Sequence, residues 1–184
     1  IGKINDTNAV NYLHQRYIQS GDTAEKQLQF LNVLVNQKTI YSYNIVGTLL
    51  TNNPPAINSN YQLSYIFQQL KDSLKLTATM APALFSLLNI EDYKDETIRL
   101  LGMLVDSGYL KPEAYNSFLP ELIIQAKNEL KRQNSDVASN RYGSSSQSTL
   151  FYFLQILQPH YTTHDEIKTF MNKCLISRDL ELRT

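Results

Sequence analysis

The chain has 184 residues, of which 42% are hydrophobic and 18% are charged, as is ordinary for one globular domain. Its 17 basic residues balance 17 acidic ones, so no net field attracts nucleic acid or anionic lipid. The single cysteine, Cys174, excludes an internal disulfide, and no apolar run approaches the roughly 20 residues of a membrane-spanning helix. We therefore expect a soluble segment that binds no nucleic acid and does not insert into membranes.

Apolar side chains recur at helical spacing along almost the whole chain, and runs that alternate like a strand are missing. Leu63, Ile66, Phe67 and Leu70, for example, fall on one face of a helix. The sequence predicts an all-α protein of about nine helices. They cover residues 6–19, 23–36, 39–52, 60–77, 80–89, 95–107, 112–134, 147–158 and 164–177, and a further helix begins at 179.

Capping residues support several of these boundaries. Gly21 and Gly108 each follow an apolar-periodic segment, at the position where the C-terminus of a helix favours glycine. Start signals precede the second helix and the last: Asp22 or Thr23 with Glu25, and Thr162 with Asp165 or Thr163 with Glu166.

Pro120 lies inside the segment that is expected to be helical over residues 112–134. A proline there removes one backbone hydrogen bond and clashes with the carbonyl of Asn116. Two structures accommodate it: a kink in one long helix, or a turn at 113–118 followed by a helix that begins at Pro120. Of the two, we adopt the kink.

The polar stretch KRQNSDVASNRYGSSSQS, residues 131–148, separates two strongly apolar segments. We expect its first residues to end a helix and residues 135–146, approximately, to form a flexible loop inserted within one all-helical domain that covers 1–184. The chain begins with Ile1 and ends on a sequence typical of the start of another helix. We therefore interpret it as a fragment of a longer protein; its compartment stays open, because a fragment can lack a signal peptide or anchor.

Three segments begin with threonine, then isoleucine or leucine, and continue as a mainly apolar helix. They are TIYSYNIVGTLL from Thr39, TIRLLGMLVDSG from Thr97 and TLFYFLQIL from Thr149, and each precedes a more amphipathic helix. In this pairing of helices, residues 39–177 resemble the α-solenoids of the HEAT and armadillo type. The three threonines are 58 and 52 residues apart, which exceeds the usual repeat length of roughly 40–47 residues. The resemblance implies an irregular right-handed stack of helix pairs with a binding or scaffolding role. A compact helical bundle is the alternative.

Few residues are candidates for chemistry. His160 and His164 are four apart, but Pro159 and the capping threonines separate them, so we expect a solvated helix start rather than a metal site. Cys174 lies on the apolar stripe of its helix and is expected to be a buried core residue rather than a nucleophile. An acidic cluster lacks the pattern of a calcium loop and suits the start of a helix instead: Glu91, Asp92, Asp95 and Glu96.

No glycine-rich phosphate loop, serine nucleophile elbow or Cys-x-x-Cys pair is present in the sequence. Lys127, Lys131 and Arg132, joined by Arg141, gather at one helix end, where basic residues are common because they complement the helix dipole. We therefore expect no cofactor, no metal ion and no catalytic residue, and we favour a protein that is not an enzyme.

The helix from residue 60 carries a polar face opposite its apolar stripe, formed by Tyr61, Tyr65, Gln68, Gln69 and Asp72. Tyrosine offers a large contact area at low entropy cost, so this face is a candidate protein- or peptide-binding surface; alternatively, another helix covers it. The sequence favours a non-catalytic interaction or scaffolding segment of a larger protein. The alternatives are a helical enzyme or ligand-binding bundle whose site is invisible in the sequence, and a structural spacer.

Overall fold

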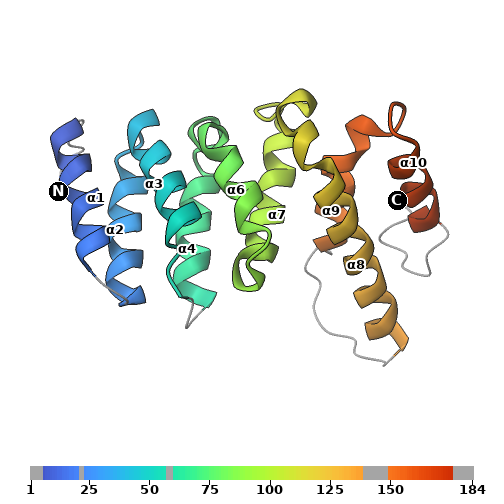
Figure 1. The fold of residues 1–184 in the computed structure, drawn as a ribbon, viewed down its shortest axis with the longest axis horizontal. Helices are drawn as coiled ribbons and strands as arrows, with labels where there is room; N and C mark the ends of the chain where they lie inside the picture. The colour runs from blue at the N-terminus through green and yellow to red at the C-terminus, as the bar shows by residue number, and fades with distance from the viewer. Residues whose placement is uncertain (1–5, 21–22, 57–59, 139–148, 176–184) are drawn as a thin grey trace. The chain divides into compact units, whose positions relative to one another are not determined.

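In a computed structural model of the chain, the structure describes residues 6–20, 23–56, 60–138 and 149–175. All regular elements within these ranges are helical, including nine α-helices of at least seven residues (Figure 1). The prediction of an all-α fold is therefore confirmed. The chain divides into two compact units, residues 1–104 and 105–184, and each is described by itself.

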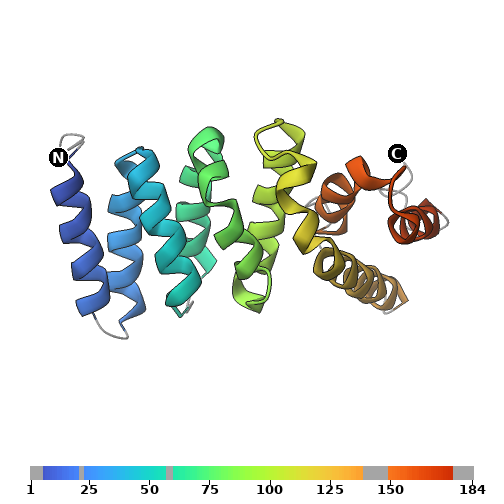
Figure 2. The same cartoon turned by 45° about the horizontal axis from the view of Figure 1, so that its top comes forward.

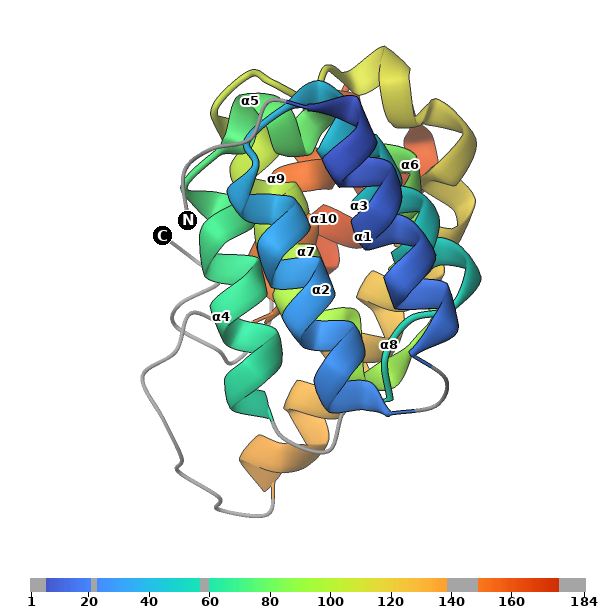
Figure 3. The ribbon, with the colours of Figure 1, turned by 90° about the vertical axis from the view of Figure 1, so that its left-hand side faces the viewer.

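The first unit begins with four helices; the bounds of α1, α2 and α3 agree with the sequence prediction to within one residue, whereas α4 ends earlier than predicted. Helix α2 packs against α1, α3 and α4, and α3 packs against α1 and the later helix α6. Seen from the α1 end, α1 and α3 lie on one side of the unit and α2 and α4 on the other (Figure 3). The bounds are α1, Thr7–Gln19; α2, Ala24–Asn36; α3, Ile40–Asn52; α4, Asn60–Lys71; and α6, Ala81–Leu87.

Helix α3 buries Tyr43, Val46, Leu49 and Leu50 in the core of this unit, whereas Ile40 and Tyr41 in its first turn are exposed. Its start is fixed by a capping box, in which the side chains of Thr39 and Ser42 each accept a hydrogen bond from the other residue's backbone N–H. In its middle, a Cβ atom added to Gly47 would lie 3.0 Å from the Cβ atom of Met80. Glycine at this position therefore lets α3 approach the segment before α6 closely.

The predicted helix over residues 60–77 is wrong in its middle. Helix α4 ends at Lys71, and the single-turn α5, Leu74–Thr77, follows after a break at Asp72 and Ser73. The buried Thr77 hydroxyl donates a hydrogen bond of 2.8 Å to the Leu70 carbonyl, which ties the new turn back to the end of α4. The apolar spacing of this segment continues across the break, so the spacing alone could not reveal it.

Helix α7, Glu91–Asp106, begins four residues before its predicted start at residue 95. Glu91 and Asp92 lie in its first turn, as expected for acidic residues near the positive end of a helix dipole. The sequence prediction missed residues 91–94 because Tyr93 is the one buried hydrophobic residue among them, and a single residue makes no periodic apolar pattern. Thr97 is buried inside this helix, whereas Thr39 caps α3 and Thr149 begins a helix. The three threonines therefore do not mark equivalent positions of a repeat.

Three buried tyrosines donate hydrogen bonds to backbone carbonyls far along the chain. The hydroxyls of Tyr17 and Tyr93 donate to the carbonyls of Asn53 and Pro55 at 2.6 and 2.7 Å, so α1 and α7 both hold the segment that follows α3. In the second unit, the Tyr115 hydroxyl donates to the Ile156 carbonyl at 2.8 Å. Burial raises the pKa of each of these tyrosines, because the phenolate would lose its hydration.

The second unit packs α8 against α9 and α10. Its core contains Phe153, Phe170 and Cys174, so the prediction that Cys174 is buried is confirmed. Burial raises the pKa of its thiol to about 11. The elements are the 3-10 segment η2, Pro112–Phe118; α8, Leu119–Ala138; α9, Thr149–Leu157; the 3-10 segment η3, Gln158–His160; and α10, Asp165–Leu175.

Pro120 does not kink a long helix. Residues 112–118 form the separate segment η2, with non-helical angles at Tyr115, and α8 begins at Leu119. Pro120 therefore lies in the first turn of α8, where proline is tolerated. The adopted interpretation was wrong, and its alternative describes the structure.

The remaining boundary predictions fare unevenly. Gly108 has a φ of 72°, as expected for glycine after a helix, whereas Gly21 and Asp22 lie outside the described residues. Thr23 is the N-cap of α2, but its side chain makes no capping hydrogen bond. Helix α10 begins at Asp165, and the Thr163 hydroxyl donates to the His160 carbonyl instead of capping it. Helix α8 continues to Ala138, and the rest of the predicted loop over 135–146 lies outside the described residues.

Candidate functional site

The apolar stripe of α4 determines which of its side chains face outward. Leu63, Ile66, Phe67 and Leu70 are all buried in the first unit. Tyr65 lies on the opposite side of the helix, and 53% of its surface is exposed. The alternative that another helix covers this face therefore does not hold for Tyr65 among the described residues, and its role in binding stays a prediction.

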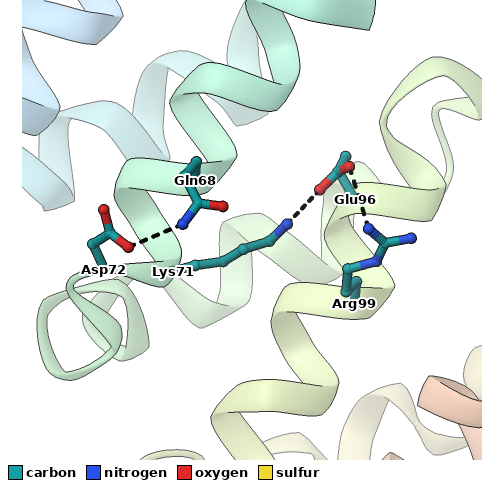
Figure 4. A network of polar contacts seen from close by, with 5 residues as sticks. All are labelled: Gln68, Lys71, Asp72, Glu96 and Arg99. Carbon is teal, nitrogen blue, oxygen red and sulfur yellow. Dashed lines mark hydrogen bonds and ion pairs between the residues drawn. The ribbon is translucent and has the colours of Figure 1, made fainter. Parts of the chain in front are cut away.

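Gln68 on α4 and Asp72, the residue that directly follows α4, are exposed on the same side as Tyr65. The Gln68 side-chain amide donates a hydrogen bond of 3.0 Å to an Asp72 carboxylate oxygen, as pairs four residues apart on a helix commonly do (Figure 4). The pair leaves the amide oxygen of Gln68 and the second carboxylate oxygen of Asp72 as acceptors. Together with Tyr65, the two residues form what we call the α4 outer face.

Gln69, by contrast, does not belong to this open surface. It is half-buried, and its side-chain amide donates a hydrogen bond of 2.7 Å to the side-chain oxygen of Asn32 on α2. This hydrogen bond joins α4 to α2, and the predicted contribution of Gln69 to partner binding stays a prediction. The side chain of Tyr61 lies outside what the structure describes.

An ion-pair network borders the α4 outer face. Lys71, the last residue of α4, places its Nζ atom 2.8 Å from Glu96 Oε2 on α7, and Arg99 Nη1 lies 3.8 Å from Glu96 Oε1 (Figure 4). The Lys71 and Glu96 side chains are only 13% and 22% exposed, so their attraction is screened less than that of a surface pair. The network fixes the C-terminal end of α4 against α7.

His160 is buried, which corrects the expectation of a solvated helix start. It is only 7% exposed, and its ring meets that of Tyr115 edge to face at 5.2 Å between centroids. Its Nε2 atom and the Nδ1 atom of His164 are buried without a hydrogen-bond partner. Burial and the nearby His164 lower the pKa of His160, and Glu113 opposes them. Among the described residues, no group of three or more potential ligands could hold a metal ion.

The predicted basic cluster at the end of α8 is largely engaged within the second unit. Lys127 pairs with Glu166 at 2.6 Å, and Arg132 pairs with the buried carboxylate of Glu129 through two contacts of 2.6 and 3.0 Å. Arg141 lies outside the described residues.

Within the described ranges, no helix combines the length and the apolar character that a membrane-spanning helix needs.

Two hollows on the first unit were not anticipated from the sequence. One, of about 390 Å³, lies between α3 and the segment that leads into α6, with asparagine and threonine side chains around Met80. The other, of about 340 Å³, lies between α1 and α2, and its described lining is Arg16, Gln19, Ser20, Lys26, Gln29 and Phe30. The sequence does contain a signal for the second hollow, because the end of α1 with its C-cap and the start of α2 each contribute three residues at the spacing i, i+3, i+4.

Neither hollow brings histidine and carboxylate groups together among its described residues.

Comparison with known proteins finds no matching family model, no matching curated protein and no matching solved structure.

Proposed function

We propose that the chain is a non-catalytic protein-interaction or scaffolding segment and that the α4 outer face, Tyr65 with Gln68 and Asp72, contacts its partner. The observation that carries the proposal is the 53% exposure of Tyr65 on a helix whose opposite face is buried. A half-exposed tyrosine loses little conformational entropy on binding and combines an apolar ring with a hydroxyl group, as residues at binding surfaces often do.

The helix that carries the α4 outer face is held in place by polar contacts with its neighbours, which favours partner recognition through a rigid surface. Gln69 and Asn32 join α4 to α2, and Lys71 and Glu96 join it to α7. A partner would therefore meet side chains on a helix that is already held in place, which lowers the ordering cost of association.

The packing of the first unit also supports a stack of the HEAT and armadillo type. Helix α1 contacts α2 and α3, helix α2 contacts α3 and α4, and helix α3 contacts α6 further along the chain. Stacked helix pairs produce this pattern, because each pair covers the apolar face of the pair before it. The link from such a stack to partner binding is a fold-level analogy.

The rival functions predict other features. A helical enzyme or ligand-binding bundle needs polar and titratable groups that converge in an enclosed pocket, and a spacer needs uniformly polar outer faces. Among the described residues, the unpartnered nitrogens of His160 and His164 are the feature closest to what an enzyme or ligand-binding bundle requires. The exposed aromatic ring of Tyr65 argues against a structural spacer with uniformly polar outer faces.

The proposal is tested with the substitution Tyr65→Ser and the matched control Tyr109→Ser, which alters another half-exposed tyrosine. The immobilised wild-type chain and both variants are incubated with extract of the source cells, and the retained proteins are quantified by mass spectrometry. We expect at least one protein to be retained by the wild type and by Tyr109→Ser and to be lost with Tyr65→Ser.

Circular dichroism melting provides the stability control. Tyr65→Ser should change stability by no more than about 0.5 kcal/mol, as substitutions of exposed residues usually do. Identical retained proteins for all three chains would refute the role of the α4 outer face. A large loss of stability would show instead that Tyr65 is part of the core.

A further inference from the structure

The hollow between α1 and α2 lies at the end of the first unit. The two helices run side by side (Figures 2 and 3), and α3 and α4 lie behind them when the unit is viewed from this end (Figure 3). Arg16 and Gln19 come from the last turn of α1, and Ser20 follows it as the C-cap. Lys26, Gln29 and Phe30 come from the first turns of α2. The hollow therefore lies near the C-terminal end of α1 and the N-terminal end of α2.

The described lining of this hollow is positively charged. Arg16 and Lys26 contribute two cations, and the other four described residues are uncharged. Neither cation is in an ion pair with another described residue; the Arg16 guanidinium lies 5.8 Å from the centre of the Tyr12 ring. The amides of Gln19 and Gln29 add further hydrogen-bond donors, so the rim is suited to an anionic group.

The walls of the hollow offer an apolar contact as well. Phe30 is half-buried, and the methylene stems of long basic side chains such as Arg16 and Lys26 present apolar surface below their charged ends. Its volume of about 340 Å³ is near the lower limit for ligand pockets, which start at roughly 300 Å³. There is space for one or two side chains rather than for a large cofactor.

We propose that this hollow binds an acidic peptide segment of a partner protein, whose carboxylates pair with Arg16 and Lys26 while a neighbouring apolar side chain packs on Phe30. The charge of the lining selects the acidic partner. The aromatic wall distinguishes a peptide from a free inorganic anion, which could use the cations but not Phe30. Two cations are too few for the many phosphate contacts on which non-specific nucleic-acid binding depends.

The site is separate from the α4 outer face. Tyr65 is not among the residues that line the hollow. The two proposals can therefore fail independently, and Tyr65→Ser serves here as a variant that should leave acidic-peptide binding unchanged.

The test is an NMR titration of the ¹⁵N-labelled chain with a synthetic peptide in which glutamates flank one leucine. NMR suits this experiment, because two ion pairs and one apolar contact give weak binding. We expect the amide signals of residues in the hollow to shift in a saturable manner. The double variant Arg16→Glu/Lys26→Glu should bind at least about tenfold more weakly, as the loss of charged hydrogen bonds predicts.

The matched control is Lys75→Glu/Lys111→Glu, which makes the same change of net charge at two exposed lysines outside the hollow. Its affinity should remain close to that of the wild type. Phe30→Ser should weaken binding of the leucine peptide but not of a peptide with serine in place of leucine. Melting curves of every variant exclude unfolding as the cause.

Four outcomes would overturn the proposal. The first is no saturable shift in the wild-type chain, and the second is equal weakening by the two charge-reversal pairs. The third is equal binding of a peptide with glutamine in place of glutamate. The fourth is tighter binding of oligothymidylate at the same residues, which would assign the hollow to a phosphate backbone instead.

Discussion

At the scale of single residues, the tyrosines have two distinct roles. Tyr65 presents its ring to solvent, whereas Tyr17, Tyr93 and Tyr115 are buried and use their hydroxyls to satisfy distant backbone carbonyls. A carbonyl at the end of a helix or in a connection has no partner within the helix ladder, so a hydroxyl from another element removes a desolvation cost.

The substitution Tyr17→Phe tests this second role. It keeps the ring and removes the donor to the Asn53 carbonyl, which is 2.6 Å away. Loss of this part-buried hydrogen bond should reduce the free energy of unfolding by about 1 kcal/mol, measured by urea denaturation. Tyr109→Phe is the control, because Tyr109 is 49% exposed, and its stability should match the wild type. Equal stability of the two variants would mean that the Tyr17 hydrogen bond contributes nothing.

Burial could be predicted for some residues and not for others. Cys174 lies on a periodic apolar stripe, so its burial follows from the helix pattern alone. His160 lies between a proline and a run of threonines, where no periodic pattern exists. Its burial comes from Tyr115, which is 45 residues earlier in the chain and belongs to η2. Only the tertiary structure brings those two rings together.

At the scale of elements, α4 depends on contacts with two neighbours. Its apolar stripe enters the core, Gln69 joins it to α2, and Lys71 joins it to Glu96 on α7. The apolar stripe was predictable, because it follows from the spacing of residues in one segment. The two polar links were not, since each one joins residues that are 25 or more positions apart.

The substitution Glu96→Gln tests the link between α4 and α7. Lys71 and Glu96 are mostly shielded from solvent, so removal of the carboxylate charge should reduce the free energy of unfolding by about 1 kcal/mol. The comparison variant is Glu166→Gln, which breaks the more exposed pair with Lys127 and should leave stability unchanged within error. A double-mutant cycle with Lys71→Met separates the pair from other effects of the substitution. A coupling energy near zero would contradict the proposed link.

At the scale of the whole molecule, the two compact units should differ in their response to acid. His160 belongs to the second unit, and its pKa is lowered because burial and the positive form of His164 disfavour a charge on its ring. The folded state therefore favours neutral His160, and the unfolded chain takes up its proton near pH 6.5. The contribution of neutral His160 to the free energy of unfolding is fully present above that pH. It is lost as the pH falls from about 6.5 toward the lower pKa of His160 in the folded state.

The measurement is urea unfolding of the full chain at pH 7.5 and pH 5.5. The free energy of unfolding should fall with pH by up to about 1.4 kcal/mol per unit for each proton taken up. The variant His160→Gln should flatten this dependence, whereas His14→Gln, in the first unit, should retain it. Hydrogen exchange, corrected for its intrinsic pH dependence, should place the loss of protection in residues 105–184. Acid sensitivity that is unchanged in His160→Gln would show that another group is responsible.

The sequence by itself determined that the described chain is helical and where most of its helices lie, because apolar spacing and capping residues act within a few positions of one another. It also indicated which side of α4 faces outward. The tertiary structure alone decided the break after Lys71, the start of α8 at Leu119, the burial of His160 and the hollow between α1 and α2. These features depend on contacts between residues that are distant in the chain, and no local pattern records which distant residues will meet.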